Sequence, residues 1–410
     1  MPRILLVLIL SAIGLSGLTA QEAVEQAQSF PSDMAREPLS DFVIENPAEG
    51  FRLRFGGKMD FDWTSFAAGG EVINSAGTFQ DGAELRRTRF AFSGKTYDWL
   101  KFKASFDITS NKSGLRDMWV EVGDIPVIGK FRVGHFKEPF GLERSNSSST
   151  QTFLERSSAS SLTPSRNAGF AVGDTLWHKQ ATWATGVFRE TSSSGDAQDS
   201  VFGDETGVTG RFTFLPWFEG TGNRLLHLGI SLSRRQPDNG FMQVSDGMQL
   251  HQSPIIVDTG LFAVDSISML SLEAATVLGP FSLQGEWLQT KAQLPGGGSV
   301  TFPGFYIQGS YFLTGEHRIY SRKNGRFSGQ SVASPFHPQK EGAGAWEVAT
   351  RLSKLDLDSG QVIGGVLRNA SFGVNWYLNE DLKVQFDYEY SELQSFGNVQ
   401  GVSVRVEFLW

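Results

Sequence analysis

The sequence predicts an all-β fold: a transmembrane antiparallel β-barrel of about sixteen strands, with one loop folded inward as a constriction. Three observations predict it. The chain of 410 residues ends on an alternating strand, similar alternation recurs from residue 51 onward, and the first twenty residues have the pattern of an export signal. Because neighbouring side chains of a strand point to opposite faces, a period of two indicates a sheet whose faces meet different surroundings.

The last strand carries the clearest alternation. One face holds Val402, Val404, Val406, Phe408 and Trp410, and the other holds Ser403, Arg405 and Glu407. A terminal strand with an aromatic carboxyl end is similar to the signal that outer-membrane barrels present to their assembly machinery. This strand therefore indicates both the fold and the compartment, the cell outer membrane.

The beginning of the chain predicts export. Arg3 precedes an apolar stretch of residues 4–10, and small residues follow up to Ala20, so residues 1–20 are predicted to be a signal peptide. A transmembrane anchor is the weaker alternative, because the apolar run is short and soon broken by serine and glycine. Residues 21–50 are polar and are predicted to form a periplasmic leader or linker, with the barrel at 51–410.

Composition excludes other classes of protein. No later segment approaches the roughly 20 apolar residues of a membrane-spanning helix. The chain has no cysteine, so it is not an exported module held together by disulfides. Its 46 glycines, 33 phenylalanines and 10 tryptophans suit twisted strands with aromatic rings at a membrane interface. A formal net charge of −8 argues against a nucleic-acid partner.

Sixteen segments have strand character, an even number that places both ends of the barrel domain on one side. They are residues 51–63, 83–94, 98–108, 115–123, 130–136, 168–177, 181–189, 205–214, 224–234, 266–278, 280–290, 303–313, 345–354, 366–378, 381–390 and 401–410. A soluble sandwich also alternates, but bulky aromatics on the apolar faces and charges of both signs on the polar faces favour a water-filled barrel in a membrane.

The connections mostly alternate between short turns and long loops. The long loops are residues 64–82, 137–167, 190–204 and 235–265. The exception is 314–344, which falls on the turn side and yet contains 31 residues. It contains either a further strand pair or an elaborated turn.

The chain gives little support to enzyme chemistry, and we expect no enzyme, no cofactor and no metal. The six histidines show no pair at metal-ligand spacing, and the mature chain has no G-x-S-x-G motif. Asp356 and Asp358 resemble part of a calcium loop, but the rest of that loop is missing, which favours an ordinary loop tip.

The polar faces of the first five strands gather positive charge. They carry the basic residues Arg52, Arg54, Lys58, Arg87, Arg89, Lys101, Lys103 and Arg132, and the acidic residues Asp60, Asp62, Asp107, Asp117 and Glu121. Rings of arginine and lysine attract anions to a pore, and arginine binds phosphate with a two-pronged geometry. The alternative is an ordinary charged wall without strong selectivity.

The loop from Lys137 to Asn167 is the predicted constriction. A sixteen-stranded barrel leaves an open channel, so an inward loop must set its width. Residues 145–150 are small and hydroxyl-bearing, apart from Asn146, and Arg144, Arg156 and Arg166 lie around them. Such hydroxyl groups donate to an anion or line a wet constriction. The same run could instead be a flexible surface loop.

At this loop the chain resembles the phosphate-selective porin family of O and P type. The residues that carry the resemblance span about 50–410 and are Glu84 to Arg89, Arg132 to Glu143, Thr152 to Ser157, Pro164 to Gly169, Phe312 to Arg318 and Gly344 to Glu347. The resemblance implies a sixteen-stranded barrel, usually trimeric, whose lumen arginines guide anions to a constriction loop.

The same resemblance implies a binding zone made of an arginine pair on the second strand and a loop lysine beside serines. Arg86 and Arg87 match the pair, although neighbours in a strand face opposite ways unless a bulge intervenes. The serines are present, but residues 145–150 contain no lysine.

The sequence thus predicts an outer-membrane porin for passive diffusion of small anions, with phosphate and polyphosphate among the candidate permeants. Its partners are expected to be membrane lipid, the permeating anions and two further copies of the chain. The anion-binding residues are predicted to be Arg86, Arg87, Arg89, Lys101, Lys103, Arg132, Arg144, Ser145, Ser147, Ser148 and Ser149. The alternatives are a porin for other solutes without phosphate selectivity, an outer-membrane enzyme, and a structural or adhesive barrel.

Overall fold

The computed structural model describes residues 42–109, 114–190, 205–339 and 341–410. The predicted signal peptide, most of the predicted leader and nearly all of the predicted loop 190–204 lie outside these residues. Among the described residues, no helix combines the length and apolar composition needed to cross a membrane.

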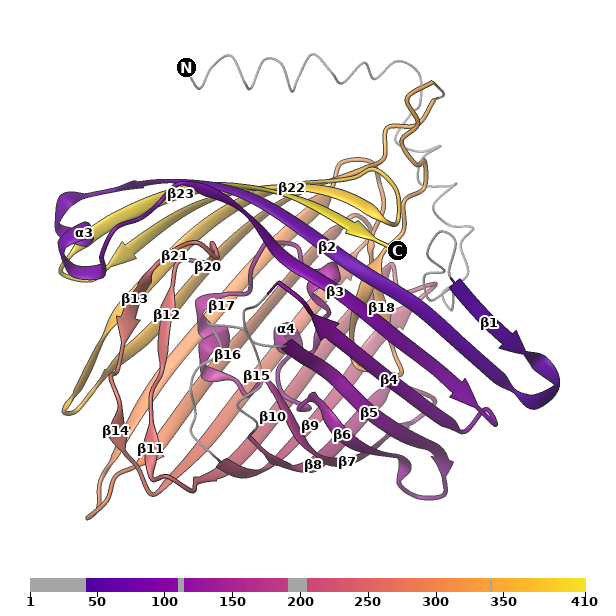
Figure 1. Cartoon of the computed structure of the whole chain (residues 1–410), viewed down its shortest axis with the longest axis horizontal. Coiled ribbons are helices and arrows are strands. Elements are labelled where there is room, and N and C mark those ends of the chain that lie inside the picture. Colours follow the sequence, from indigo (N-terminus) through magenta and orange to yellow (C-terminus); the bar gives the residue numbers. More distant parts are fainter. Residues whose placement is uncertain (1–41, 110–113, 191–204, 340) are drawn as a thin grey trace.

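The predicted barrel is confirmed (Figure 1). Within the described residues, sixteen strands each pair antiparallel with their neighbours along the chain, and β23 pairs with β2 to close the sheet. They are β2 (Phe51–Ala68), β3 (Gly82–Thr96), β4 (Leu100–Asp107), β5 (Gly114–Ile125), β6 (Gly129–Lys137), β7 (Arg166–Leu176), β8 (Ala181–Arg189), β9 (Glu205–Glu219), β10 (Arg224–Pro237), β15 (Ser266–Leu278), β16 (Phe281–Gln293), β17 (Ser299–Phe312), β20 (Ala345–Ser359), β21 (Val362–Tyr377), β22 (Leu382–Leu393) and β23 (Gly397–Leu409). Each corresponds in order to one predicted segment.

An additional strand, β1 (Phe42–Asn46), lies outside the barrel closure. It pairs antiparallel with the start of β2, from Phe42 opposite Phe55 to Asn46 opposite Phe51. The 3-10 turn η1 (Pro47–Glu49) joins the two strands. The sequence of this segment shows no strand pattern, because its five mostly exposed residues have no buried face to impose a period of two.

The two faces of the barrel wall have opposite polarity, as alternation predicts. In β2, Asp60 and Asp62 are buried toward the lumen, whereas Phe61 and Trp63 are 42% and 49% exposed on the outside. The carboxyl end is fixed to the same strand, because the Gly57 amide donates to the Trp410 carbonyl at 2.8 Å. A side chain at position 57 would collide with the Trp410 ring, so glycine is required for this closure.

Two loops fold into the barrel and fill part of the lumen. The first, residues 138–165, contains α4 (Leu142–Ser145), η2 (Ser148–Thr150) and η3 (Ser158–Leu162). The second, residues 238–265, forms two small sheets from β11 (Phe241–Met242), β12 (Ser245–Gly247), β13 (Ile255–Asp258) and β14 (Phe262–Ala263). A short helix, α3 (Gly70–Ala76), follows β2 and packs Val72 against the second loop through Met248 and Leu250.

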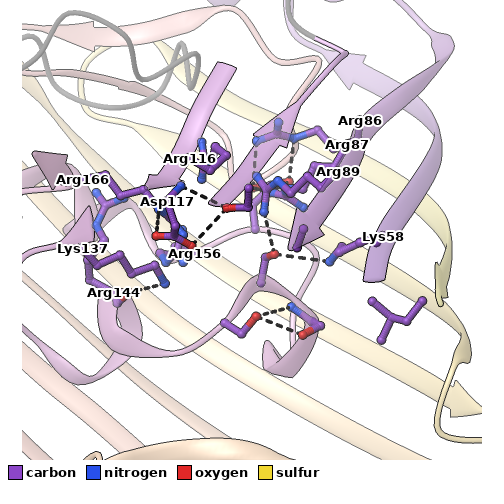
Figure 2. Close-up of a pocket in the computed structure, with 18 of the residues that line it drawn as sticks. Lys58, Arg86, Arg87, Arg89, Arg116, Asp117, Lys137, Arg144, Arg156 and Arg166 are labelled. Atoms are coloured by element: carbon purple, nitrogen blue, oxygen red, sulfur yellow. Dashed lines mark hydrogen bonds and ion pairs between the residues drawn. The ribbon is translucent and has the colours of Figure 1, made fainter. Parts of the chain in front are cut away.

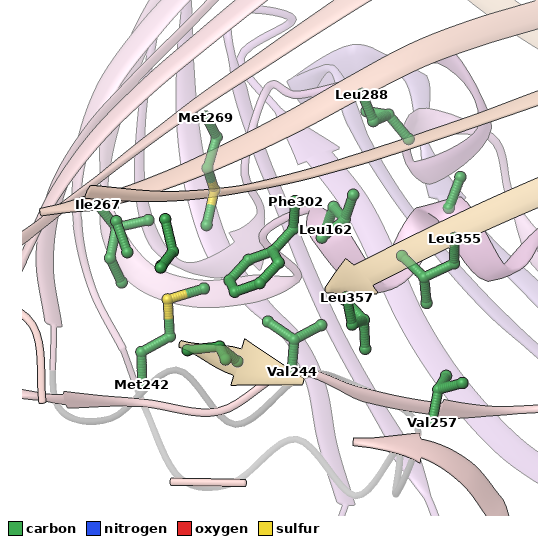
Figure 3. Close-up of a cluster of buried hydrophobic side chains, with 14 of the residues drawn as sticks. Leu162, Met242, Val244, Val257, Ile267, Met269, Leu288, Phe302, Leu355 and Leu357 are labelled. Atoms are coloured by element: carbon green, nitrogen blue, oxygen red, sulfur yellow. The ribbon is translucent and has the colours of Figure 1, made fainter. Parts of the chain in front are cut away.

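The two inward loops share a dry core with the barrel wall (Figure 3). Leu162 of the first loop and Val244 of the second pack with Phe302 of β17 and Leu355 of β20, and each is at most 1% exposed. The wall residues of this core belong to β15–β17 and β20–β22 and lie toward the end of the barrel from which the two inward loops enter. Because apolar burial excludes water, this cluster forms a dry region inside the barrel.

The long segment on the turn side contains a strand pair, which resolves the two alternatives left by the sequence. Strands β18 (Arg318–Ser321) and β19 (Arg326–Gln330) form their own antiparallel sheet. Tyr320 and Phe327 of this hairpin are buried against Leu142 of the first inward loop. The hairpin therefore enters the lumen from the turn end and meets the loop that enters from the other end.

Candidate functional site

A β-bulge in β3 turns both arginines of the expected pair into the lumen. Asp60 of β2 is opposite Arg87, and the next residue, Phe61, is opposite Leu85, so Arg86 is an extra residue. Arg86 and Arg87 are 8% and 3% exposed, whereas Leu85 points outward and is 53% exposed. The bulge that lets two neighbouring arginines face the same side is therefore present.

A second bulge occurs in β5 and brings in an arginine that sequence reasoning missed. Ser105 is opposite Asp117 and Phe106 is opposite Leu115, so Arg116 is the extra residue. Both Arg116 and Asp117 are buried on the lumen side. The only sequence signal is two adjacent charged residues within an otherwise alternating strand, the same signal that Arg86 and Arg87 give.

The two bulged strands line a cavity of about 410 Å³ between the barrel wall and the first inward loop (Figure 2). Eleven basic residues and three acidic residues line it, which gives the cavity a strong excess of positive charge. The basic residues are Arg54, Lys58, Arg86, Arg87, Arg89, Lys103, Arg116, Lys137, Arg144, Arg156 and Arg166, and the acidic ones are Asp117, Glu155 and Asp246.

The loop serines meet the basic wall at Ser148. Its hydroxyl oxygen accepts from the Arg89 guanidinium at 3.0 Å and from the Lys58 ammonium at 3.4 Å. Because a hydroxyl carries two lone pairs and one proton, Ser148 can still donate its proton to an anion in the cavity. Ser147 and Ser149, whose hydroxyls are 3.0 Å apart, line the same cavity.

Lys137 supplies a cation beside these serines although the run 145–150 contains no lysine. Its ammonium donates to the Arg144 carbonyl at 2.8 Å and to the Asn146 carbonyl at 2.6 Å. An ammonium group has three N–H donors, so one N–H remains that can donate to another group. Lys137 is the last residue of β6, eight positions before Ser145, and only the fold of the loop brings it back to the serines.

The wall acids that the sequence placed among the bases form ion pairs with them. Asp107 lies 2.7 Å from Arg89. Asp117 lies 3.0 Å from Lys103 and 3.0 Å from Arg166. These pairs reduce the field that a permeating anion meets, but the lining as a whole stays basic.

The first inward loop is fixed by hydrogen bonds to itself and to the opposite wall. Arg144, predicted to bind anions, donates to the Thr163 hydroxyl at 2.8 Å and to the Ser160 carbonyl at 2.9 Å, so it also holds the loop in shape. At the far wall, Glu286 of β16 accepts from the Leu142 amide at 2.9 Å. These hydrogen bonds hold the loop in a defined position inside the lumen.

Three predicted residues lie outside this cavity. Arg132 and Ser145 line a second cavity of about 180 Å³, shared with Lys130, Lys323 and Arg326, and Lys137 is common to both cavities. The Arg132 guanidinium lies 4.1 Å above the Trp119 ring and 2.5 Å from Glu121. The Lys101 side chain is half exposed and lines neither cavity.

Solved structures with a similar fold are bacterial porins and other outer-membrane proteins. OmpT of Vibrio cholerae matches with a TM-score of 0.55 at 9% identity, covering 90% of this chain and all of that one. The anion-selective porin from Comamonas acidovorans matches with a TM-score of 0.52 at 13% identity, covering 88% of this chain and all of that one. Identities this low show the shared fold alone.

Comparison of amino-acid sequences identifies relatives as well as a shared fold. Porin O of Pseudomonas aeruginosa is 25% identical over 431 residues, covering 95% of this chain and 94% of the relative. A protein of Caulobacter vibrioides without an assigned function is 26% identical over 75% of this chain and 62% of its own length. The family model described as phosphate-selective porin O and P matches residues 53–399. With most of the barrel matched, this chain belongs to the family of phosphate-selective porins O and P.

Proposed function

We propose that this outer-membrane porin passes small anions by passive diffusion, with inorganic phosphate as its main candidate permeant and no chemical step. The observation that carries the proposal is the excess of arginine and lysine around the cavity between the β2–β5 wall and the first inward loop. The names of two similar proteins, Porin O and the anion-selective porin, agree with it.

The proposed path follows the wall formed by β2–β6. The dry core and the β18–β19 hairpin fill other parts of the lumen, which favours passage of an anion along the basic lining. Ser148, Lys58 and Arg89 form one contact point, and Lys137 is shared with the second cavity closer to the turn end. Sites in series let an ion bind firmly enough to enter and weakly enough to leave.

Replacing Arg89 by glutamine is expected to lower the anion preference of the channel and to weaken block of chloride current by phosphate. Because the variant loses a positive charge at contact distance from the bound phosphate, the dissociation constant of phosphate should rise roughly five- to tenfold. The measurements are the reversal potential in a salt gradient and the chloride current at increasing phosphate concentration, both in planar bilayers.

The control for this variant is Arg224→Gln, a side chain that is 62% exposed in an ion pair with Glu219 at the turn end. It should leave both readings at the wild-type value. Cation preference of the wild-type channel would contradict the proposed function, and equal effects of the two variants would contradict the role of Arg89.

We also propose that the porin assembles as a trimer. One OmpT structure with a similar fold is described in its trimer form. The outer face of the barrel is apolar over the short strands β4 and β6, where Phe106 and Val133 are exposed, and such a face suits lipid and a neighbouring subunit alike. Chemical cross-linking in native membranes should give a trimer band, and monomer alone would contradict this assembly.

A further inference from the structure

Arg86 and Arg87, the arginine pair, already bind a carboxylate of the protein itself. Glu155, from the first inward loop, lies between the two guanidinium groups. Its carboxylate accepts from Arg86 at 3.0 and 3.3 Å and from Arg87 at 2.7 and 2.8 Å. A third guanidinium, that of Arg405 in β23, donates to the same carboxylate at 2.8 Å. The Glu155 side chain is only 8% exposed.

A carboxylate and a phosphate compete for the same guanidinium geometry. Both present two oxygens to the parallel N–H groups of an arginine, and both carry negative charge. Arg87 also donates to Asp60 at 3.0 Å, so acceptors of the protein occupy both sides of its guanidinium. A permeating anion must displace Glu155 to accept from the N–H groups that now bind this carboxylate.

The local charge balance agrees with this geometry. The ion pairs of this cluster join four acidic residues to five basic ones, which leaves the cluster nearly neutral. The acidic residues are Glu155, Asp60, Asp62 and Glu407, and the basic residues are Arg86, Arg87, Arg405, Lys58 and Lys383. The excess of positive charge in the cavity therefore comes from the part of its lining farther along the wall, including Arg116, Lys137 and Arg156.

We propose that Glu155 is a built-in competitor for permeating anions at the arginine pair and that it sets a weak affinity of this channel for phosphate. The inference rests on the proposed anion path and adds a residue that determines its specificity. In this channel the arginine pair fastens the inward loop to the wall, and the anion binds instead around Ser148 and Arg89 and farther along the basic lining.

Glu155 stays negatively charged near neutral pH. Burial alone would raise the pKa of Glu155, but Arg86, Arg87 and Arg405 hold this pKa well below its usual range. The Glu155 carboxylate is therefore ionised at neutral pH.

The test is Glu155→Gln, which keeps the shape of the side chain and removes its charge. Block of chloride current by inorganic phosphate in planar bilayers should become roughly tenfold tighter, and the anion preference in a salt gradient should rise. Glu155→Asp keeps the charge and should stay close to wild type. The matched control is Glu121→Gln, which removes another lumen carboxylate, one paired with Arg132 away from the pair, and should change the block much less.

Heat-modifiable migration on a gel first establishes that each variant forms a folded barrel. Unchanged phosphate block in Glu155→Gln would overturn the inference, as would an equal gain in Glu121→Gln. A larger chloride conductance with weaker block would also overturn it, because Glu155 would then serve only to hold the loop. Failure of the proposed function is separate, since it would show as cation preference of the wild-type channel.

Discussion

Replacing Arg405 by methionine is expected to lower the free energy of unfolding by about 3–5 kcal/mol, the usual cost of removing one partner from a buried ion pair. Arg405 is 1% exposed and donates to both carboxylate oxygens of Asp62 at 2.6 Å. It also donates to the Leu154 carbonyl at 2.6 Å and to Glu155 at 2.8 Å. One side chain thus joins the last strand, the first barrel strand and the inward loop.

The loss of stability can be measured in detergent, as a lower denaturant concentration or temperature at which the folded gel band disappears. Arg368→Met is the matched control, because it breaks an ion pair with Glu392 in which both side chains are about half exposed, 48% and 49%. Exposed pairs contribute roughly 0–1 kcal/mol. If the two variants lose equal stability, burial of Arg405 is not the reason for its importance.

Deleting the β18–β19 hairpin is expected to raise the single-channel conductance at least about twofold, because a sixteen-stranded barrel without filling elements leaves a wide aqueous channel. Arg318 of the hairpin donates to Gln284 of β16 at 3.0 Å, and Tyr320 lies 2.7 Å from the His227 ring nitrogen. These contacts fill the part of the lumen beside the second cavity, which Lys323 and Arg326 of the hairpin segment also line. Without them, polar wall residues such as Glu273 would face water.

The deletion is practical because the hairpin ends are already neighbours. Arg318 is opposite Gln330, so a short glycine-serine linker can replace residues 318–330. The deletion widens the path and removes Lys323 and Arg326 from the lining of the second cavity, so anion preference should fall as conductance rises. Replacing the exposed residues 337–339 of the same segment with glycine and serine is the control and should leave the conductance unchanged. An unchanged conductance after the hairpin deletion would mean that the hairpin does not obstruct the lumen.

The fold could be predicted from the sequence because the membrane imposes one rule on every strand. Lipid outside and water inside demand opposite polarity on successive residues, so each of the sixteen barrel strands shows its position locally. The strand β1 lacks this constraint and gave no signal. The basic wall was predictable for the same reason, since Lys58, Arg89 and Lys103 follow directly from the alternation.

The site itself was only partly predictable. Arg86 and Arg87 share a face only because β3 contains one extra residue at a bulge. In the sequence, such a bulge appears only as an interruption of the polar–apolar alternation, which can also have other causes. The conformation of the loop places Ser145 in a second cavity, with Arg132 of β6, and it directs Arg144 into hydrogen bonds that hold the loop.

The sequence by itself determined the barrel, its strand order and the excess of basic residues on the first strands, because these depend on each residue and its immediate neighbours. The tertiary structure decided which cations share a cavity. Lys137 reaches the serines, and Glu155 reaches Arg86 across 69 positions, only because the loop folds back against the wall. Contacts between distant segments depend on packing and on the balance of buried charges, and neither leaves a periodic trace in the chain.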